Sequence, residues 1–137
     1  MRRGFSWLAA LLYVSAGAFH FLKPEPYLRI IPPWVPWPSA AVLVSGWAEV
    51  VGGVGMMLPR YRRAAAWWLA ALLVAVFPAN LNMALHPAET GGAAVPVVLL
   101  WLRLPVQGLL IWWVLWCSAV EPESHRQAVG VGNQEPH

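Results

Sequence analysis

Apolar residues fall into four long runs, separated by short polar or proline-rich segments. The runs cover residues 5–22, 39–58, 64–85 and about 95–120. Each is close to the roughly 20 residues that a helix needs to cross a bilayer. Because the runs lack the period-two alternation of membrane β-strands, helices are the predicted spanning elements. We therefore predict an all-α integral membrane protein, a four-transmembrane-helix bundle formed by residues 1–120.

Composition supports this prediction. The chain has 137 residues, enough for one domain, of which 59% are hydrophobic and only 11% are charged. Soluble domains usually carry about 25% charged residues, so too few charges remain here to cover a soluble surface. Ten tryptophans fit a membrane–water interface. We expect a multi-pass protein of a cell membrane, the bacterial inner membrane, with the lipid bilayer as its surroundings.

The basic residues predict an orientation. Arg2 and Arg3 precede the first run, and Arg60, Arg62 and Arg63 lie between the second and third. Arginines of membrane proteins collect on the cytoplasmic side, so the N-terminus and this turn are predicted to be cytoplasmic. The net charge of +3 is clustered instead of spread over a solvated face, which argues against a nucleic-acid partner.

The remaining connections follow from that orientation. The segment 86–94 has no Lys or Arg and is predicted to face outward, and the polar tail 121–137 is predicted to be a disordered cytoplasmic segment, like the C-terminus itself. An alternative concerns the first run. Residues 1–18 also resemble a signal peptide that ends in the small-residue site Ala16-Gly17-Ala18.

The first outer connection, residues 23–38, is rich in proline. It reads KPEPYLRIIPPWVPWP and holds six prolines. Pro26 is suited to the first turn of a short helix. We interpret the segment as an interfacial anchor that uses Trp34 and Trp37. A rigid lid over the outer end of the bundle is the alternative.

Two charged residues lie inside the predicted spans. Glu49 is ten residues into the second run and Arg103 eight residues into the fourth, which places both roughly 12–15 Å below the outer surface. A lone charge at this depth costs about 2.5–3.5 kcal/mol on insertion scales. We predict that Glu49 pairs with Arg103 and that Gln107, one turn further along, completes the network. The alternative is an uncharged, protonated Glu49.

Small residues recur every four positions on the second run, at Ala41, Ser45 and Gly53, with Glu49 in the same register. Such faces allow helices to approach closely. Glu49 is therefore predicted to point into the bundle and away from lipid.

Other polar residues of the spans gather in the outer half. His20 ends the first run, and Asn80, Asn82 and His86 lie near the end of the third. The inner half has no comparable cluster, so we predict a polar pocket close to the outer face. The asparagines could equally hydrogen-bond between helices, and the histidines could be purely interfacial or bracket a metal or haem. The single cysteine excludes an intramolecular disulfide or a CxxC relay.

Several short motifs resemble the DoxX-like family of small four-helix membrane proteins. They are Gly17–Phe21, Pro24 with Tyr27, Ile31–Pro36, Ser45-Gly46 with Glu49 and Gly52-Gly53, Leu58-Pro59 with Arg62-Arg63, Val76–Asn80 and Trp101–Pro105 with Gln107. The resemblance covers about residues 5–117 and implies a four-helix bundle. It also implies His20, Glu49, Asn80 and Arg103 as the polar core, and an association with quinone-coupled redox complexes. Some relatives of this architecture use cysteine pairs, which this chain lacks.

Three functions are compatible with these features. The first is a subunit of a membrane redox complex that binds a quinone headgroup in the outer pocket and receives electrons from a membrane or periplasmic partner. The second is a non-catalytic scaffold in which the Glu49–Arg103 pair fixes helix order. The third is a small binder or transporter of a lipid or other hydrophobic molecule, in which case an oligomer would supply the missing helices.

Overall fold

The computed structural model describes residues 2–119, and within this range every regular element is helical. The elements are α1 (Arg2–Leu22), α2 (Glu25–Ile30), α3 (Pro38–Met57), α4 (Arg62–Leu85), the short 3-10 helix η1 (Gly92–Ala94) and α5 (Val97–Ser118). Four of them, α1, α3, α4 and α5, are long and apolar enough to cross a membrane. The predicted all-α class with four long helices is confirmed, whereas the tail 121–137 lies outside the described residues.

The helix bounds differ from the predicted runs by a few residues. α1 begins at Arg2 and α4 at Arg62, because arginine is a good helix former and need not end a helix where the apolar run ends. α5 begins only after Pro96. The proline-rich connection contains the extra helix α2, whose first turn holds Pro26 as predicted.

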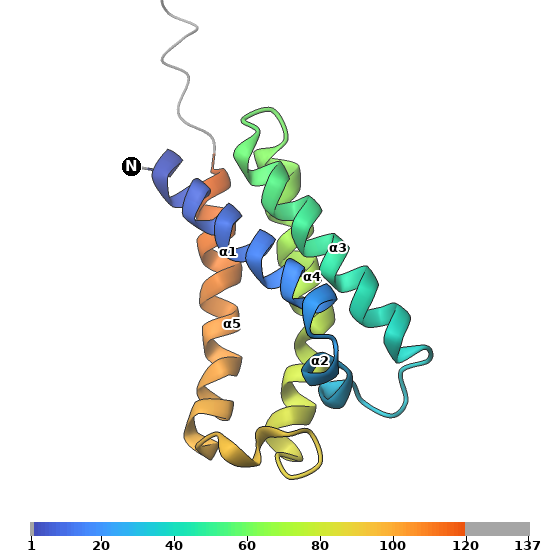
Figure 1. The fold of residues 1–137 in the computed structure, drawn as a ribbon. Coiled ribbons are helices and arrows are strands. Elements are labelled where there is room, and N and C mark those ends of the chain that lie inside the picture. Colours follow the sequence, from blue (N-terminus) through green and yellow to red (C-terminus); the bar gives the residue numbers. More distant parts are fainter. Residues whose placement is uncertain (1, 120–137) are drawn as a thin grey trace, which may run out of the picture.

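The helices are arranged as two pairs. α1 packs along α3, and α4 packs along α5, while α3 also contacts α4 (Figure 1). The N-terminus and the α3–α4 turn lie at one end, which we call the arginine end because Arg3 and Arg60–Arg63 are there. α2 and the α4–α5 connection lie at the opposite end, called here the α2 end (Figure 1).

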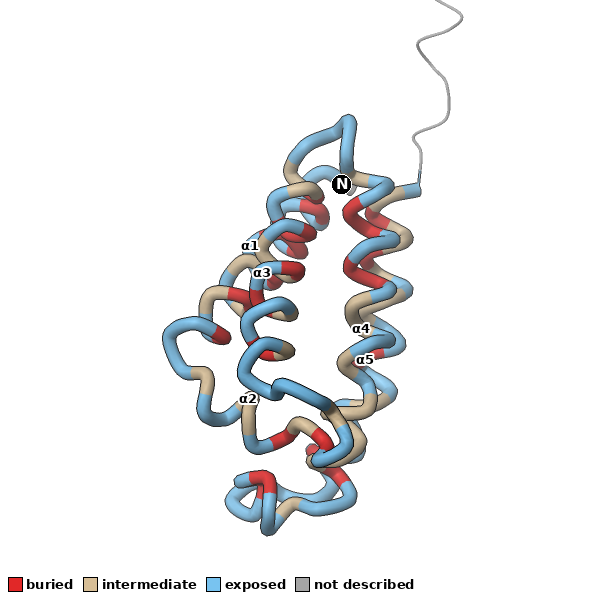
Figure 2. The backbone as a smooth tube through the Cα atoms, turned by 90° about the vertical axis from the view of Figure 1, so that its right-hand side faces the viewer, coloured by how far each residue is buried: buried red, intermediate tan, exposed pale blue. Residues whose placement is uncertain are grey.

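The packed core lies toward the arginine end. Figure 2 shows buried residues where the two pairs come together there. This core consists of small and medium apolar side chains, namely Ala9, Ala10, Tyr13, Met56, Ala65, Ala66, Leu69, Val114 and Cys117. Many large apolar side chains instead face outward, among them Trp7, Val44 and Trp112. An apolar outer surface of this extent suits hydrocarbon and would be a liability in water.

The closest contact between α1 and α3 depends on two glycines. A Cβ atom added at Gly17 would lie 2.6 Å from the carbonyl oxygen of Gly46, and one added at Gly46 would lie 2.7 Å from Cβ of His20. Only glycine lets the two backbones approach this far. The approach fixes the position of His20 relative to α3.

Candidate functional site

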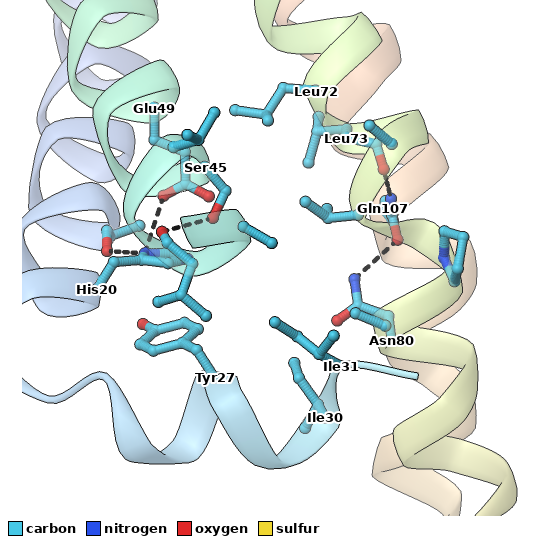
Figure 3. Close-up of a pocket in the computed structure, with 18 of the residues that line it drawn as sticks. His20, Tyr27, Ile30, Ile31, Ser45, Glu49, Leu72, Leu73, Asn80 and Gln107 are labelled. Carbon is cyan, nitrogen blue, oxygen red and sulfur yellow. Dashed lines mark hydrogen bonds and ion pairs between the residues drawn. The ribbon is translucent and has the colours of Figure 1, made fainter. Parts of the chain in front are cut away.

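A cavity of about 670 Å³ separates the two helix pairs toward the α2 end. One wall comes from α1 and α3, the opposite wall from α4 and α5, and α2 with the following residues closes the end (Figure 3). Most of the lining is aliphatic. The polar side chains that line it are Tyr13, His20, Tyr27, Ser45, Glu49, Asn80, Arg103 and Gln107. Most of the polar residues that were predicted to gather in one half of the bundle therefore line a cavity.

On the first wall, His20 of α1 faces Glu49 of α3. His20 is buried, and its Nδ1 lies 2.9 Å from the carbonyl oxygen of Ala16 and 3.7 Å from Oε2 of Glu49. A carbonyl oxygen can only accept, so Nδ1 carries the hydrogen and donates it to Ala16. The contact with Glu49 is too long for a hydrogen bond and is an electrostatic one.

Two polar atoms of this wall have no hydrogen-bond partner. They are Oε2 of Glu49 and the hydroxyl oxygen of Tyr13, both of them buried. The side chain of Glu49 is only 14% exposed, and Tyr13 is 3% exposed. Buried polar groups of folded proteins are almost always hydrogen-bonded, so both atoms require an explanation.

Tyr27 of α2 covers this wall from the α2 end. Its ring stacks on the His20 ring, with centroids 3.8 Å apart and planes inclined by 21° (Figure 3). Partial burial raises the pKa of Tyr27 above the ordinary 10.0, with a smaller contribution from the Glu49 carboxylate that is opposed by Arg103. Tyr27 therefore stays a neutral phenol that covers one face of the His20 ring.

On the opposite wall, an amide pair joins α4 to α5. Asn80 donates through Nδ2 to Oε1 of Gln107 at 3.0 Å, and Gln107 donates through Nε2 to the carbonyl oxygen of Leu73. Pro78 has no N–H and leaves the carbonyl of Val74 without its usual helical partner. Gln107 thus supports α4 within the turn that the proline weakens, and it is itself buried.

The predicted Glu49–Arg103 salt bridge is wrong. Within residues 2–119, the basic side chain in contact with Glu49 is His20, whereas Nη1 of Arg103 lies 3.5 Å from Sδ of Met83. Gln107 likewise bonds to α4 and not to Glu49. Arg103 lines the cavity but is exposed, so it lies at the rim while Glu49 lies on the far wall. The inward orientation predicted for Glu49 agrees with the structure.

Asn82 and His86 are not part of the cavity lining. Asn82 donates to the carbonyl oxygen of Ile30 at 3.0 Å, and its Oδ1 lies 3.1 Å from Nδ1 of the exposed His86. The first contact ties the end of α2 to α4. His20 and His86 take different partners, and within residues 2–119 no group of three or more His, Cys, Asp or Glu side chains is placed to hold a metal ion.

The proline-rich connection has features that each predicted role requires. Ile30 and Pro32 are buried, and residues from Ile31 to Val35 line the cavity, as a lid would. Trp34 and Trp37 are 70% and 79% exposed, as interfacial anchors would be. Part of the connection therefore lines the cavity, while its roles as a lid and as an interfacial anchor stay predictions.

Sequence reasoning missed Tyr13 and Tyr27 as cavity residues. Tyr13 lies seven residues before His20, two helical turns away on the same face of α1, and this spacing could have revealed it. No local signal places Tyr27 on His20, because that contact depends on how the connection folds back.

Known proteins offer little to compare with this site. No curated protein and no solved structure matches the chain. A family match covers residues 8–118, which include α1 from residue 8 onward, the other three long helices in full and every cavity residue named above. The chain therefore belongs to the family described as Domain of unknown function (DUF8561).

Proposed function

We propose that this protein is a multi-pass membrane protein that binds a quinone headgroup in the cavity between its two helix pairs, as a subunit of a redox complex. The observation that carries the proposal is the two-sided lining of the cavity. His20 and Glu49 lie on one wall and Asn80 lies on the other, with aliphatic side chains between them. A para-quinone has this pattern, a flat apolar ring with oxygen atoms at two opposite edges.

The size and location of the cavity support the same ligand. The cavity volume is about 670 Å³. Small-molecule sites typically enclose roughly 300–1,000 Å³ and are mostly apolar, with a few placed polar groups. The outward-facing surface near the rim is apolar, as at Val44 and Val106. An isoprenoid tail could leave the cavity there and remain in lipid.

The orientation and the wider family relationship are part of the proposal. The concentration of arginines at the arginine end favours a cytoplasmic location for that end, so the cavity would lie in the outer leaflet of a bacterial inner membrane. A relationship to DoxX-like proteins, suggested by the sequence motifs, agrees with a redox role. Electrons would then be exchanged with a membrane or periplasmic partner.

Direct binding tests this function. Purified protein in nanodiscs should bind a decyl-substituted benzoquinone saturably, and Ala79→Phe, which fills the cavity from α4, should abolish binding. Ala71→Phe is the matched control, because Ala71 is exposed on the same helix and does not line the cavity. Absence of binding to the wild-type protein, or equal binding by both variants, would refute the proposal.

A second candidate function is supported by Arg103. Its guanidinium lies at the cavity rim and, among the described residues, no carboxylate lies within ion-pair distance of it. An anionic amphiphile, such as a lipid with a phosphate or carboxylate head, would supply the missing charge. Mass spectrometry of lipids that copurify with wild type and with Arg103→Gln distinguishes this binder or transporter from a quinone protein. A scaffold, the remaining alternative, would retain no specific ligand.

A further inference from the structure

The unpartnered polar atoms of the first wall indicate which form of the ligand the cavity accepts. Oε2 of Glu49 and the hydroxyl of Tyr13 are buried and have no hydrogen-bond partner in the described structure, and both residues belong to the cavity lining. A folded protein that leaves two such atoms unsatisfied loses stability. A bound group that reaches both atoms would remove this cost, so the pair marks a subsite.

The two residues line the cavity from α1 and α3, which pack against each other. Tyr13 and His20 lie on the same face of α1, two turns apart. Between them, Gly17 packs so closely on α3 that an added Cβ would lie 3.1 Å from Cβ of Glu49. His20 is already engaged by the carbonyl of Ala16. Nε2 of His20 is then a free acceptor, so His20 and Glu49 offer acceptors on this wall, whereas Tyr13 can also donate.

The chemistry of the two groups selects the ligand. A carboxylate can only accept hydrogen bonds, whereas a phenol can donate and accept. A carbonyl oxygen would satisfy Tyr13 but would be repelled by Glu49 in its ionised form. A hydroxyl group satisfies both, because it donates to Glu49 and accepts from Tyr13.

We propose that Tyr13 and Glu49 form a subsite for a hydroxyl group of the ligand, so that the cavity binds a quinol more tightly than the matching quinone. This inference rests on the proposed quinone function and adds a preference for the reduced form. It concerns binding alone and requires no electron transfer within this chain.

Two substitutions test the subsite. Tyr13→Phe removes only a hydroxyl that has no partner in the protein, so the fold should be preserved. Loss of one hydrogen bond should weaken binding of a decyl-substituted benzoquinol about 3- to 10-fold and weaken binding of the benzoquinone less. Tyr61→Phe is the matched control, since Tyr61 is exposed in the α3–α4 turn. Glu49→Gln introduces an N–H donor and should shift the preference toward the quinone.

The measurement is a titration of each protein in nanodiscs with both ligands, with the quinol kept reduced under argon. The subsite is supported if wild type binds the quinol more tightly than the quinone and Tyr13→Phe selectively weakens quinol binding. The subsite is overturned, and the quinone site left intact, if wild type binds the two forms with equal affinity or if Tyr13→Phe binds the quinol as tightly as wild type does. If wild type binds neither form, the proposed function fails and the subsite fails with it.

Discussion

Replacing Gly17 by alanine adds one methyl group at the tightest point between α1 and α3. The new Cβ would lie 2.6 Å from the carbonyl oxygen of Gly46 and 2.8 Å from Cγ2 of Val50. The side chain of Val50 could rotate away, but the carbonyl belongs to the α3 backbone. The helices must therefore move apart, and the facing pair of His20 and Glu49 must move with them.

The size of the effect follows from a matched substitution. Overpacking a well-packed contact costs about 1–3 kcal/mol. Alanine also favours a helix over glycine by up to about 1 kcal/mol, which would partly hide this cost. Gly108→Ala supplies the control, because no atom lies within 4 Å of a Cβ built at Gly108, which is exposed on α5. The propensity gain is common to both variants, so their unfolding free energies should differ by about 1–3 kcal/mol.

The assay is reversible unfolding in mixed micelles by increasing mole fractions of a denaturing detergent, followed by circular dichroism and tryptophan fluorescence. Gly17→Ala should unfold at a lower detergent fraction than wild type, and Gly108→Ala at the same or a higher one. Folded Gly17→Ala should also bind quinone more weakly, because His20 and Glu49 are displaced. Equal stability of the two alanine variants would show that α1 and α3 are not in close contact at Gly17.

Three further predictions concern the other parts of the site. In a double-mutant cycle of Asn80→Ala and Gln107→Ala, the coupling free energy of unfolding should be about 0.6 kcal/mol and at most about 1.7 kcal/mol. These are the average and maximum for hydrogen bonds between membrane helices. A coupling free energy of zero would contradict the amide pair. Asn82→Leu removes the hydrogen bond to Ile30 and should accelerate hydrogen exchange in α2 while leaving α1 unchanged, and unchanged exchange in α2 would mean that other contacts hold the lid. Because the pKa of Tyr27 is raised, its favourable contribution is complete below about pH 10 and is lost as the pH rises through the raised pKa. Tyr27→Phe should therefore reduce the fall in stability above pH 10, and an identical pH profile would refute the burial of this phenol.

The sequence was sufficient to predict the four long helices. Their lengths are set by the apolar runs, and their ends by prolines and by the change to polar residues. α2 was predictable only as a turn at Pro26, because six residues are too few for a clear apolar period. The concentration of polar side chains toward one end was also predictable, since it requires only that residues be placed along each helix axis.

The partners of those side chains were not predictable. Counting residues places Glu49 and Arg103 at a similar depth but does not give their angular positions around α3 and α5. In the structure α1 lies against α3, so His20 reaches Glu49 first, and Arg103 turns to the rim. Similarly, Asn80 and Asn82 are two residues apart and so point in different directions, one to Gln107 and the other to α2.

The absence of the Glu49–Arg103 contact changes how Glu49 is best explained. A purely architectural carboxylate would have its acceptors satisfied by the helices that it joins, as the amides of Asn80 and Gln107 do on the other wall. Glu49 instead keeps one buried oxygen without a donor, next to the equally unpartnered Tyr13. His20 lies 3.7 Å from this oxygen but donates its Nδ1 hydrogen to the carbonyl of Ala16. Packing therefore explains the position of Glu49, whereas its remaining acceptor is the one that the proposed ligand would satisfy.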